Sequence, residues 1–212
     1  MVVTAERNEP ERSSPDEAER LVAAAWGVLA RTGFEGFKVA SVIRAAGSST
    51  KAFYRHFDSK EAMLLALLLD ESTRASARLA RRVSAATTPT DAVLVWIATI
   101  LGSAASGEYA ARARLFSSLG QINAHFPRAI MESRQRMMAP LLEALTQGSG
   151  SGEFPRADPA SDAALVMALC GAVLRDLVDH ISQIDVEHAI NDTQSFVLRS
   201  LGVALRPGEQ VD

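Results

Sequence analysis

The chain has 212 residues, of which 48% are apolar, enough for the core of one large domain or two small ones. Its longest apolar run, residues 163–174, is shorter than the roughly 20 residues that span a bilayer, and residues 1–15 lack the apolar stretch of a signal peptide. The net charge is −3, and the single cysteine, Cys170, excludes an internal disulfide, so we expect a cytoplasmic protein.

Three helices are predicted at the start of the chain, of which the second and third are short. The first begins after an N-cap at Ser14 with Pro15 in its first position, and Gly33 ends it. The second and third cover residues 39–46 and 50–56, with a glycine-containing turn between them.

Longer helices follow. A capping box at Asp58 and Glu61 opens the fourth, and a cap at Thr88 opens the fifth, which is apolar on nearly every side and should be central. Further helices are predicted over residues 109–119, 128–147 (interrupted by Pro140), 159–180 and 186–201, with the sequence GSGSGEFPR at 148–156 as a flexible linker. No alternating strand pattern of useful length appears, so the sequence predicts an all-α fold of about nine helices.

The charge is unevenly distributed. Residues 31–60 hold six basic and two acidic side chains, a local charge of +4, and all three lysines of the chain lie there. A basic patch on an acidic protein is typical of a surface that binds a polyanion, although chance clustering on a solvated face would look the same.

The helices at 39–46 and 50–56, joined by a three-residue turn, form a helix-turn-helix. An α-helix fits the major groove of B-DNA and reads base edges from its first turn, while hydroxyls and cations nearby hold phosphates. The residues expected to contact DNA are Lys38, Ser49, Thr50, Lys51, Tyr54, His56 and Lys60.

This segment resembles the TetR family of transcriptional repressors. The matching pattern comprises Gly33-Phe34-Glu35, Val39, Val42, Ala46-Gly47, Ser49, Phe53-Tyr54, His56-Phe57 and Ser59-Lys60-Glu61. The chain departs from the family's usual residues at Lys38, Ile43, Ser48 and Lys51, so no operator sequence can be carried over.

The resemblance implies a three-helix DNA-binding domain, a second domain that binds a ligand and dimerises, and release from operator DNA when a small molecule binds. We expect a disordered tail over residues 1–14, the DNA-binding domain over 15–60 and the second domain over 61–206. An activator, a regulator answering a protein partner, or a helical small-molecule carrier remain alternatives. The sequence contains neither a Gly-x-Ser-x-Gly nor a His-Glu-x-x-His motif, so we expect no enzyme, cofactor or metal.

Two further sets of residues are candidates for the second domain. Small side chains on the eighth helix would let a partner helix approach closely, which predicts a homodimer interface formed by Ala164, Ala168, Gly171, Ala172, Val197 and Leu201. Apolar and adaptable side chains are typical of ligand pockets, and the candidates to line one are Trp96, Phe116, Met131, Met137 and Met138. Ordinary packing within one chain is the alternative for both sets.

Overall fold

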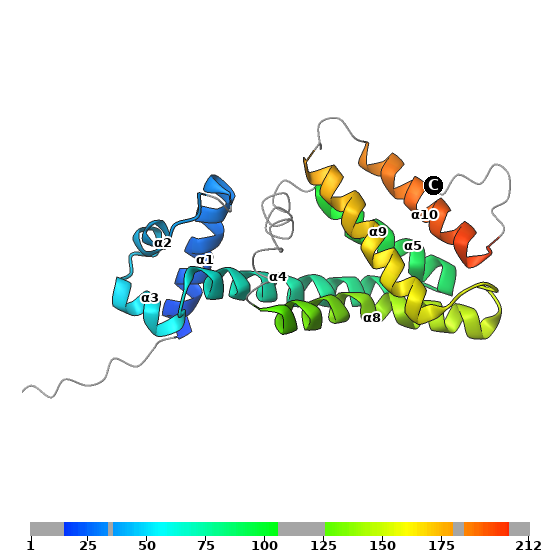
Figure 1. The fold of residues 1–212 in the computed structure, drawn as a ribbon, viewed down its shortest axis with the longest axis horizontal. Helices are drawn as coiled ribbons and strands as arrows, with labels where there is room; N and C mark the ends of the chain where they lie inside the picture. Colours follow the sequence, from blue (N-terminus) through cyan, green and yellow to red (C-terminus); the bar gives the residue numbers. More distant parts are fainter. Residues whose placement is uncertain (1–14, 34–35, 106–125, 180–184, 204–212) are drawn as a thin grey trace, which may run out of the picture. The chain divides into compact units, whose positions relative to one another are not determined.

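The computed structural model describes residues 15–33, 36–105, 126–179 and 185–203 (Figure 1). Those residues form eight α-helices and one 3-10 turn, and none of them forms a strand, so the all-α prediction is confirmed. The helix predicted over residues 109–119 lies outside the described residues. No described helix combines the length and the apolar character that crossing a membrane requires.

The chain divides into two compact units, residues 1–67 and residues 68–212. The boundary falls inside α4 (Lys60–Val83), so this one helix supplies residues to both units. The predicted boundary at residue 60 stays a prediction.

The first unit contains α1 (Pro15–Thr32), α2 (Val39–Ala46), α3 (Thr50–His56) and the start of α4. Its helices pack because each has one apolar side, and the fully buried side chains are Leu21, Ala25, Val42, Phe53, Met63, Leu64 and Leu67. This small core leaves the other side of α2 and α3 exposed.

Backbone caps set the angle between α2 and α3. Gly47 has φ +59°, in the left-handed region that favours glycine, and its N–H donates to the carbonyl of Arg44 while Ser48 N–H donates to the carbonyl of Ile43. Ser49 then caps α3, because its hydroxyl accepts the N–H of Ala52 at 3.1 Å. The turn between the two helices is therefore closed by hydrogen bonds at both ends.

The predicted start of α4 is corrected by one residue. The side chain that caps this helix is Ser59, whose hydroxyl accepts the N–H of Ala62 at 3.0 Å, and not Asp58. The acceptor three residues before the N–H is the preferred geometry, and Ser59 is the residue directly before the first helical position.

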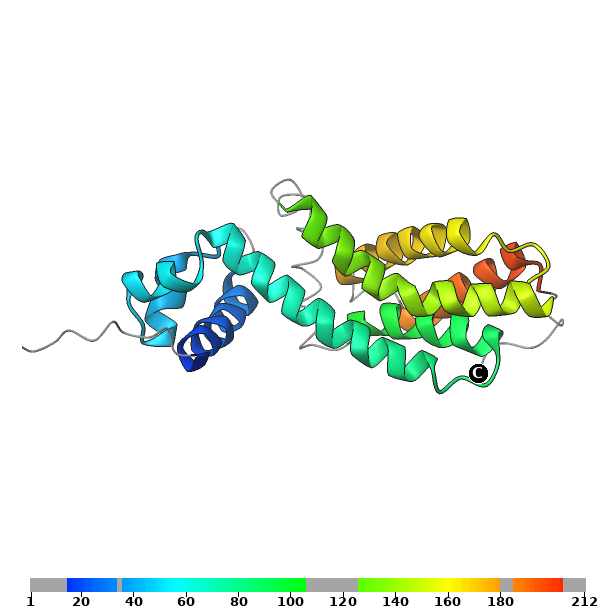
Figure 2. The ribbon, with the colours of Figure 1, turned by 90° about the horizontal axis from the view of Figure 1, so that it is seen from below.

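The second unit is arranged around α5 (Pro89–Gly102), which contacts α8 (Pro127–Ser151), α9 (Pro159–Asp179) and α10 (Val186–Leu201) and leads into the 3-10 turn Ser103–Ala105 (Figure 2). The expectation that α5 is central is confirmed, and its residue Trp96 is completely buried. Gln194 of α10 fixes the α5–α10 contact by donating its side-chain N–H to the carbonyl of Leu94 at 2.9 Å.

The predicted linker at 148–156 is wrong. Residues 148–151 form the last turn of α8, Gly152 ends that helix at φ +80°, and Phe154 folds back until it is 1% exposed. A Cβ on Gly148 would lie 2.1 Å from the Phe154 ring, so the glycine is required for close packing. The glycine and serine content of residues 148–152 predicted a flexible segment, whereas the packing of Phe154 against Gly148 gives it a fixed structure.

Candidate DNA-contacting surface

The third helix exposes one arc and buries the opposite one. Thr50, Lys51 and Tyr54 are exposed, Tyr54 to 56%, whereas Ala52 and Phe53 are buried. At about 100° per residue the three exposed side chains fall within roughly 100° of one another, and the two buried ones lie on the far side. We call the arc of Thr50, Lys51 and Tyr54 the outer arc.

The residues before and after the outer arc have different environments. Lys38 is exposed at the residue before α2, where its side chain makes no capping hydrogen bond. Ser49 is exposed, and its hydroxyl oxygen accepts the backbone N–H of Ala52, which caps the start of α3. Lys60 is partly buried at the first position of α4.

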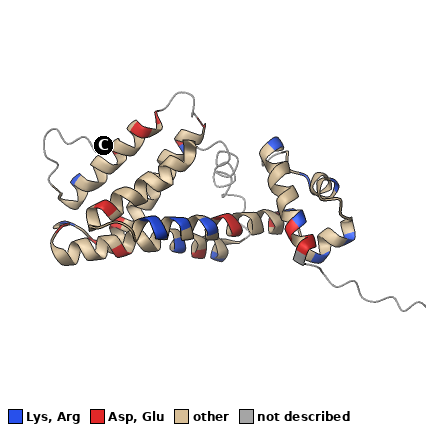
Figure 3. Ribbon diagram, turned by 180° about the vertical axis from the view of Figure 1, so that it is seen from behind, with Lys and Arg blue, Asp and Glu red and all other residues tan. Residues whose placement is uncertain are grey.

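The segment that carries the outer arc is rich in basic residues. Residues 36–57 contain four basic side chains, Lys38, Arg44, Lys51 and Arg55, and no acidic one. In Figure 3 the ribbon of α2 and α3 accordingly carries blue segments and no red one. This concentration of cations next to exposed hydroxyls gives a surface suited to a polyanion.

His56 points elsewhere than predicted. It lies on the same side of α3 as Ala52 and Phe53, with its side chain 9% exposed, and its Nε2 is 3.3 Å from Oε2 of Glu17. His56 thus contacts a carboxylate of α1, and its predicted contact with phosphate stays a prediction. This contact of Glu17 was not predicted from the sequence.

The predicted ligand residues do not form one group. Trp96 is buried, and its indole N–H donates to the carbonyl of Met137 at 3.1 Å. Met137 and Met138 are partly buried against the same core, whereas Met131 is 56% exposed. Phe116 lies outside the described residues. The structure thus brings together Trp96, Met137 and Met138.

Pro140 lies inside α8, three residues after the carbonyl that accepts the indole N–H of Trp96. A proline has no N–H, so the carbonyl four residues earlier, that of Arg136, receives no helical hydrogen bond from it. A buried tryptophan N–H needs an acceptor, and the carbonyl of Met137 supplies one. The helix continues through the proline without ending.

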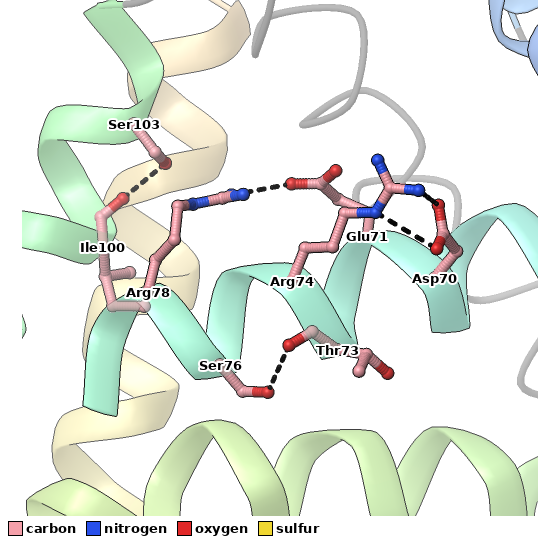
Figure 4. A network of polar contacts seen from close by, with 8 residues as sticks. All are labelled: Asp70, Glu71, Thr73, Arg74, Ser76, Arg78, Ile100 and Ser103. Carbon is pink, nitrogen blue, oxygen red and sulfur yellow. Dashed lines mark hydrogen bonds and ion pairs between the residues drawn. The ribbon is translucent and has the colours of Figure 1, made fainter. Parts of the chain in front are cut away.

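A buried polar group in the second unit was not predicted from sequence. Glu71 of α4 is 2% exposed and accepts a hydrogen bond from Arg78 Nη2 at 2.9 Å (Figure 4). The next residue, Ser72, is buried and hydrogen-bonded to Ser133 of α8. Paired charges and paired hydroxyls are the way buried polar groups are tolerated.

The predicted dimer residues separate into two environments. Ala164, Ala168, Gly171 and Ala172 are exposed along α9, beside Leu165, which is 64% exposed. Val197 and Leu201 are each 1% exposed inside the core of their own unit. The exposed apolar residue of α10 is instead Phe196, at 56%. The sequence pattern identified the exposed face of α9 but chose the inward face of α10.

Cys170 and Asp185 contribute to the fold: the first is buried in the core and the second caps a helix. Cys170 is buried in the core, and this burial raises the pKa of its thiol to about 12. Asp185 caps α10 by accepting the N–H groups of Glu187 and His188. No cluster of His, Cys, Asp and Glu among the described residues is placed to hold a metal ion.

These features define a helix-turn-helix protein, and comparison with known proteins gives the family. Residues 21–67 match the family described as "Bacterial regulatory proteins, tetR family". A curated relative, the HTH-type transcriptional regulator CymR of Pseudomonas putida, is 42% identical over 79 residues; the alignment spans 35% of this chain and 38% of CymR. Residues 21–67, the helix-turn-helix region, therefore carry the sequence signature of the TetR family of bacterial regulators.

Solved structures extend the likeness to the whole fold. The regulator FadR of Bacillus subtilis, in complex with stearoyl-CoA, has a TM-score of 0.73 at 20% identity and covers 86% of this chain and 98% of its own. The fatty acid degradation regulator FadR of Bacillus halodurans has a TM-score of 0.72 at 19% identity, with 87% and 95% covered. At these identities the likeness establishes the fold.

Proposed function

We propose that this protein reads a palindromic operator as a homodimer and represses transcription until a small hydrophobic ligand releases it. One observation carries the DNA-reading part: the outer arc presents Thr50, Lys51 and Tyr54 together, next to the basic surface of residues 36–57. A carrier protein has no use for such a surface.

The outer arc and its neighbours divide the work of binding. Lys51 and Thr50 stand in the first turn of α3, which is the part of a recognition helix that reaches base edges. Lys38, Tyr54 and Lys60 contact phosphates, which positions the protein without specifying sequence. Ser49 holds the helix start and His56 its end.

The exposed face of α9 and α10 is the proposed dimer interface. Leu165 and Phe196 expose apolar side chains, while Ala168 and Gly171 leave room for a second helix to approach. A second copy related by two-fold symmetry would cover the same surface on both chains. Two recognition helices then meet successive major grooves about 34–36 Å apart.

The second unit is the proposed ligand-binding unit. Its support is the apolar surrounding of Trp96 with the adaptable side chains of Met137 and Met138, and the stearoyl-CoA bound to FadR of Bacillus subtilis. Because α4 contributes to both units, a ligand that shifts it in the second unit acts on the first. By linkage, ligand and operator weaken each other equally, typically by about 1–3 kcal/mol.

Selection of bound fragments from random-sequence DNA tests the proposal. We expect recovery of a palindrome, binding as a dimer, and repression of a reporter placed behind the recovered fragment. Compounds that quench the fluorescence of a Trp26→Phe variant, in which Trp96 is the remaining tryptophan, should bind more weakly when the fragment is present. Recovery of no preferred sequence would contradict DNA reading, reporter activation would contradict repression, and equal ligand affinity with and without DNA would contradict release.

A further inference from the structure

Glu17 connects the first turn of α1 to the last turn of α3. Its Oε2 lies 3.3 Å from Nε2 of His56 and 3.7 Å from Nη1 of Arg55. The three side chains are mostly buried, with 19% of Glu17, 9% of His56 and 25% of Arg55 exposed. A carboxylate held this closely to two basic groups forms a stronger contact than an exposed ion pair.

The apolar packing of α3 leaves its rotation poorly fixed. This helix has seven residues, of which only Ala52 and Phe53 are buried. Apolar contacts are not directional, so the packing of Phe53 against the core and against the Phe57 ring constrains the rotation of this short helix less closely than a directional contact does. A hydrogen bond from an imidazole N–H to a carboxylate is directional, and the His56–Glu17 contact supplies it.

The position of His56 on the helix determines what its anchor controls. At about 100° per residue, His56 lies roughly 140° from Lys51 and roughly 120° from Thr50 around the axis of α3. Holding His56 against α1 therefore turns Thr50 and Lys51 outward. A rotation of α3 would move both of them relative to the base edges of a bound duplex.

We propose that Glu17 is a positioning residue: its carboxylate fixes the rotation of α3 through His56 and Arg55 and thereby sets sequence preference. This inference rests on the proposed DNA-reading function. Glu17 touches no base in this account, and it acts through the helix that does.

The charge of Glu17 and its positioning role predict opposite changes in DNA affinity when the carboxylate is removed. A carboxylate beside a basic DNA-binding surface repels phosphate, so removing its charge alone should strengthen binding to every DNA sequence. Loss of positioning should instead weaken operator binding relative to random DNA. The ratio of operator affinity to random-DNA affinity therefore distinguishes the two effects: loss of charge leaves this ratio unchanged, and loss of positioning lowers it.

Glu19 provides a matched control. It lies two residues further along α1, is exposed, and changes the net charge of the unit by the same amount when replaced by glutamine. We would measure the affinities of Glu17→Gln and Glu19→Gln for the selected palindrome and for a scrambled fragment of equal length. Glu19→Gln should slightly raise the affinity for the palindrome and for the scrambled fragment and leave the ratio of the two affinities unchanged. Glu17→Gln should lower the ratio by up to about tenfold, because a neutral amide oxygen replaces the charged carboxylate as the acceptor.

Two further variants separate positioning from folding. Glu17→Asp keeps the charge but withdraws the carboxylate by one methylene, so the ratio should fall without the general gain in affinity. His56→Gln as a single substitution should lower the ratio of operator affinity to random-DNA affinity. Combined with Glu17→Gln it should lower this ratio little further, because both substitutions act on the same contact. Circular dichroism and thermal unfolding report whether each variant remains folded.

The outcomes distinguish the two claims. Equal ratios in Glu17→Gln, Glu17→Asp and Glu19→Gln would overturn the positioning role while leaving DNA reading intact. Full additivity of Glu17→Gln and His56→Gln would also overturn it. A wild-type protein that does not prefer the palindrome over the scrambled fragment would overturn the proposed function, and the positioning role with it.

Discussion

The two units place their distinctive residues in opposite ways. The first unit puts Thr50, Lys51 and Tyr54 on its surface, supported by a small core and by caps at both ends of a short turn. The second unit buries Trp96 and Glu71 within packed helices. Surface residues of the first unit should therefore control binding with little effect on stability, and interior residues of the second should control stability.

Replacing one aromatic residue in each unit tests this contrast most strongly. Trp96→Ala removes a completely buried side chain and its hydrogen bond to Met137, so the free energy of unfolding should fall by about 3–5 kcal/mol. Tyr54→Ala removes a side chain that is 56% exposed, and stability should change by no more than about 0.5 kcal/mol. Urea unfolding followed by circular dichroism measures both. A comparable loss in the two variants would break the contrast.

The end of α8 offers a smaller but better controlled comparison. Gly148→Ala drives a methyl group into the Phe154 ring and should cost about 1–3 kcal/mol. Gly150→Ala, in the same helical turn with open space around it, should stabilise the protein by up to about 1 kcal/mol because alanine favours helix. Thermal unfolding of the pair gives the answer. If both substitutions stabilise, this segment is not packed as described.

Two adjacent serines should give the smallest effects, with opposite signs. Ser49→Ala removes the cap of α3 and should cost about 1 kcal/mol. The buried Oγ of Ser48 has no hydrogen-bond partner among the described residues, so Ser48→Ala should leave stability unchanged or raise it by up to about 1 kcal/mol. Denaturant midpoints of the two variants test the contribution of each hydroxyl. If Ser48→Ala lowers the free energy of unfolding as much as Ser49→Ala does, the different roles of the two hydroxyls are contradicted.

Local signals explain what the sequence predicted correctly. The helix-turn-helix depends on Gly47 and on the cap at Ser49, which act within a few residues of themselves. The failures depend on particular side-chain contacts that residue propensity and periodicity do not state. Glu17 meets His56 across 39 positions, and the fold of residues 148–154 depends on an aromatic ring against a glycine. Whether Val197 faces inward or outward depends on where α5 lies, which periodicity does not state.

The division of labour on the DNA-contacting surface is the central claim, and two lysines test it directly. Lys51 and Lys38 are both exposed and carry the same charge, but only Lys51 stands on the outer arc. The measurement is the affinity of Lys51→Ala and Lys38→Ala for the selected palindrome, for its single-base variants and for random DNA, over a range of salt concentrations.

Lys38→Ala should weaken all sequences alike and reduce the salt slope by about one unit. Lys51→Ala should weaken the palindrome by about 1–3 kcal/mol and relax the preference at one operator position, with a smaller loss on random DNA. An equal loss on specific and random DNA in both variants, with every base preference retained, would contradict the assignment of the outer arc as the surface that reads sequence.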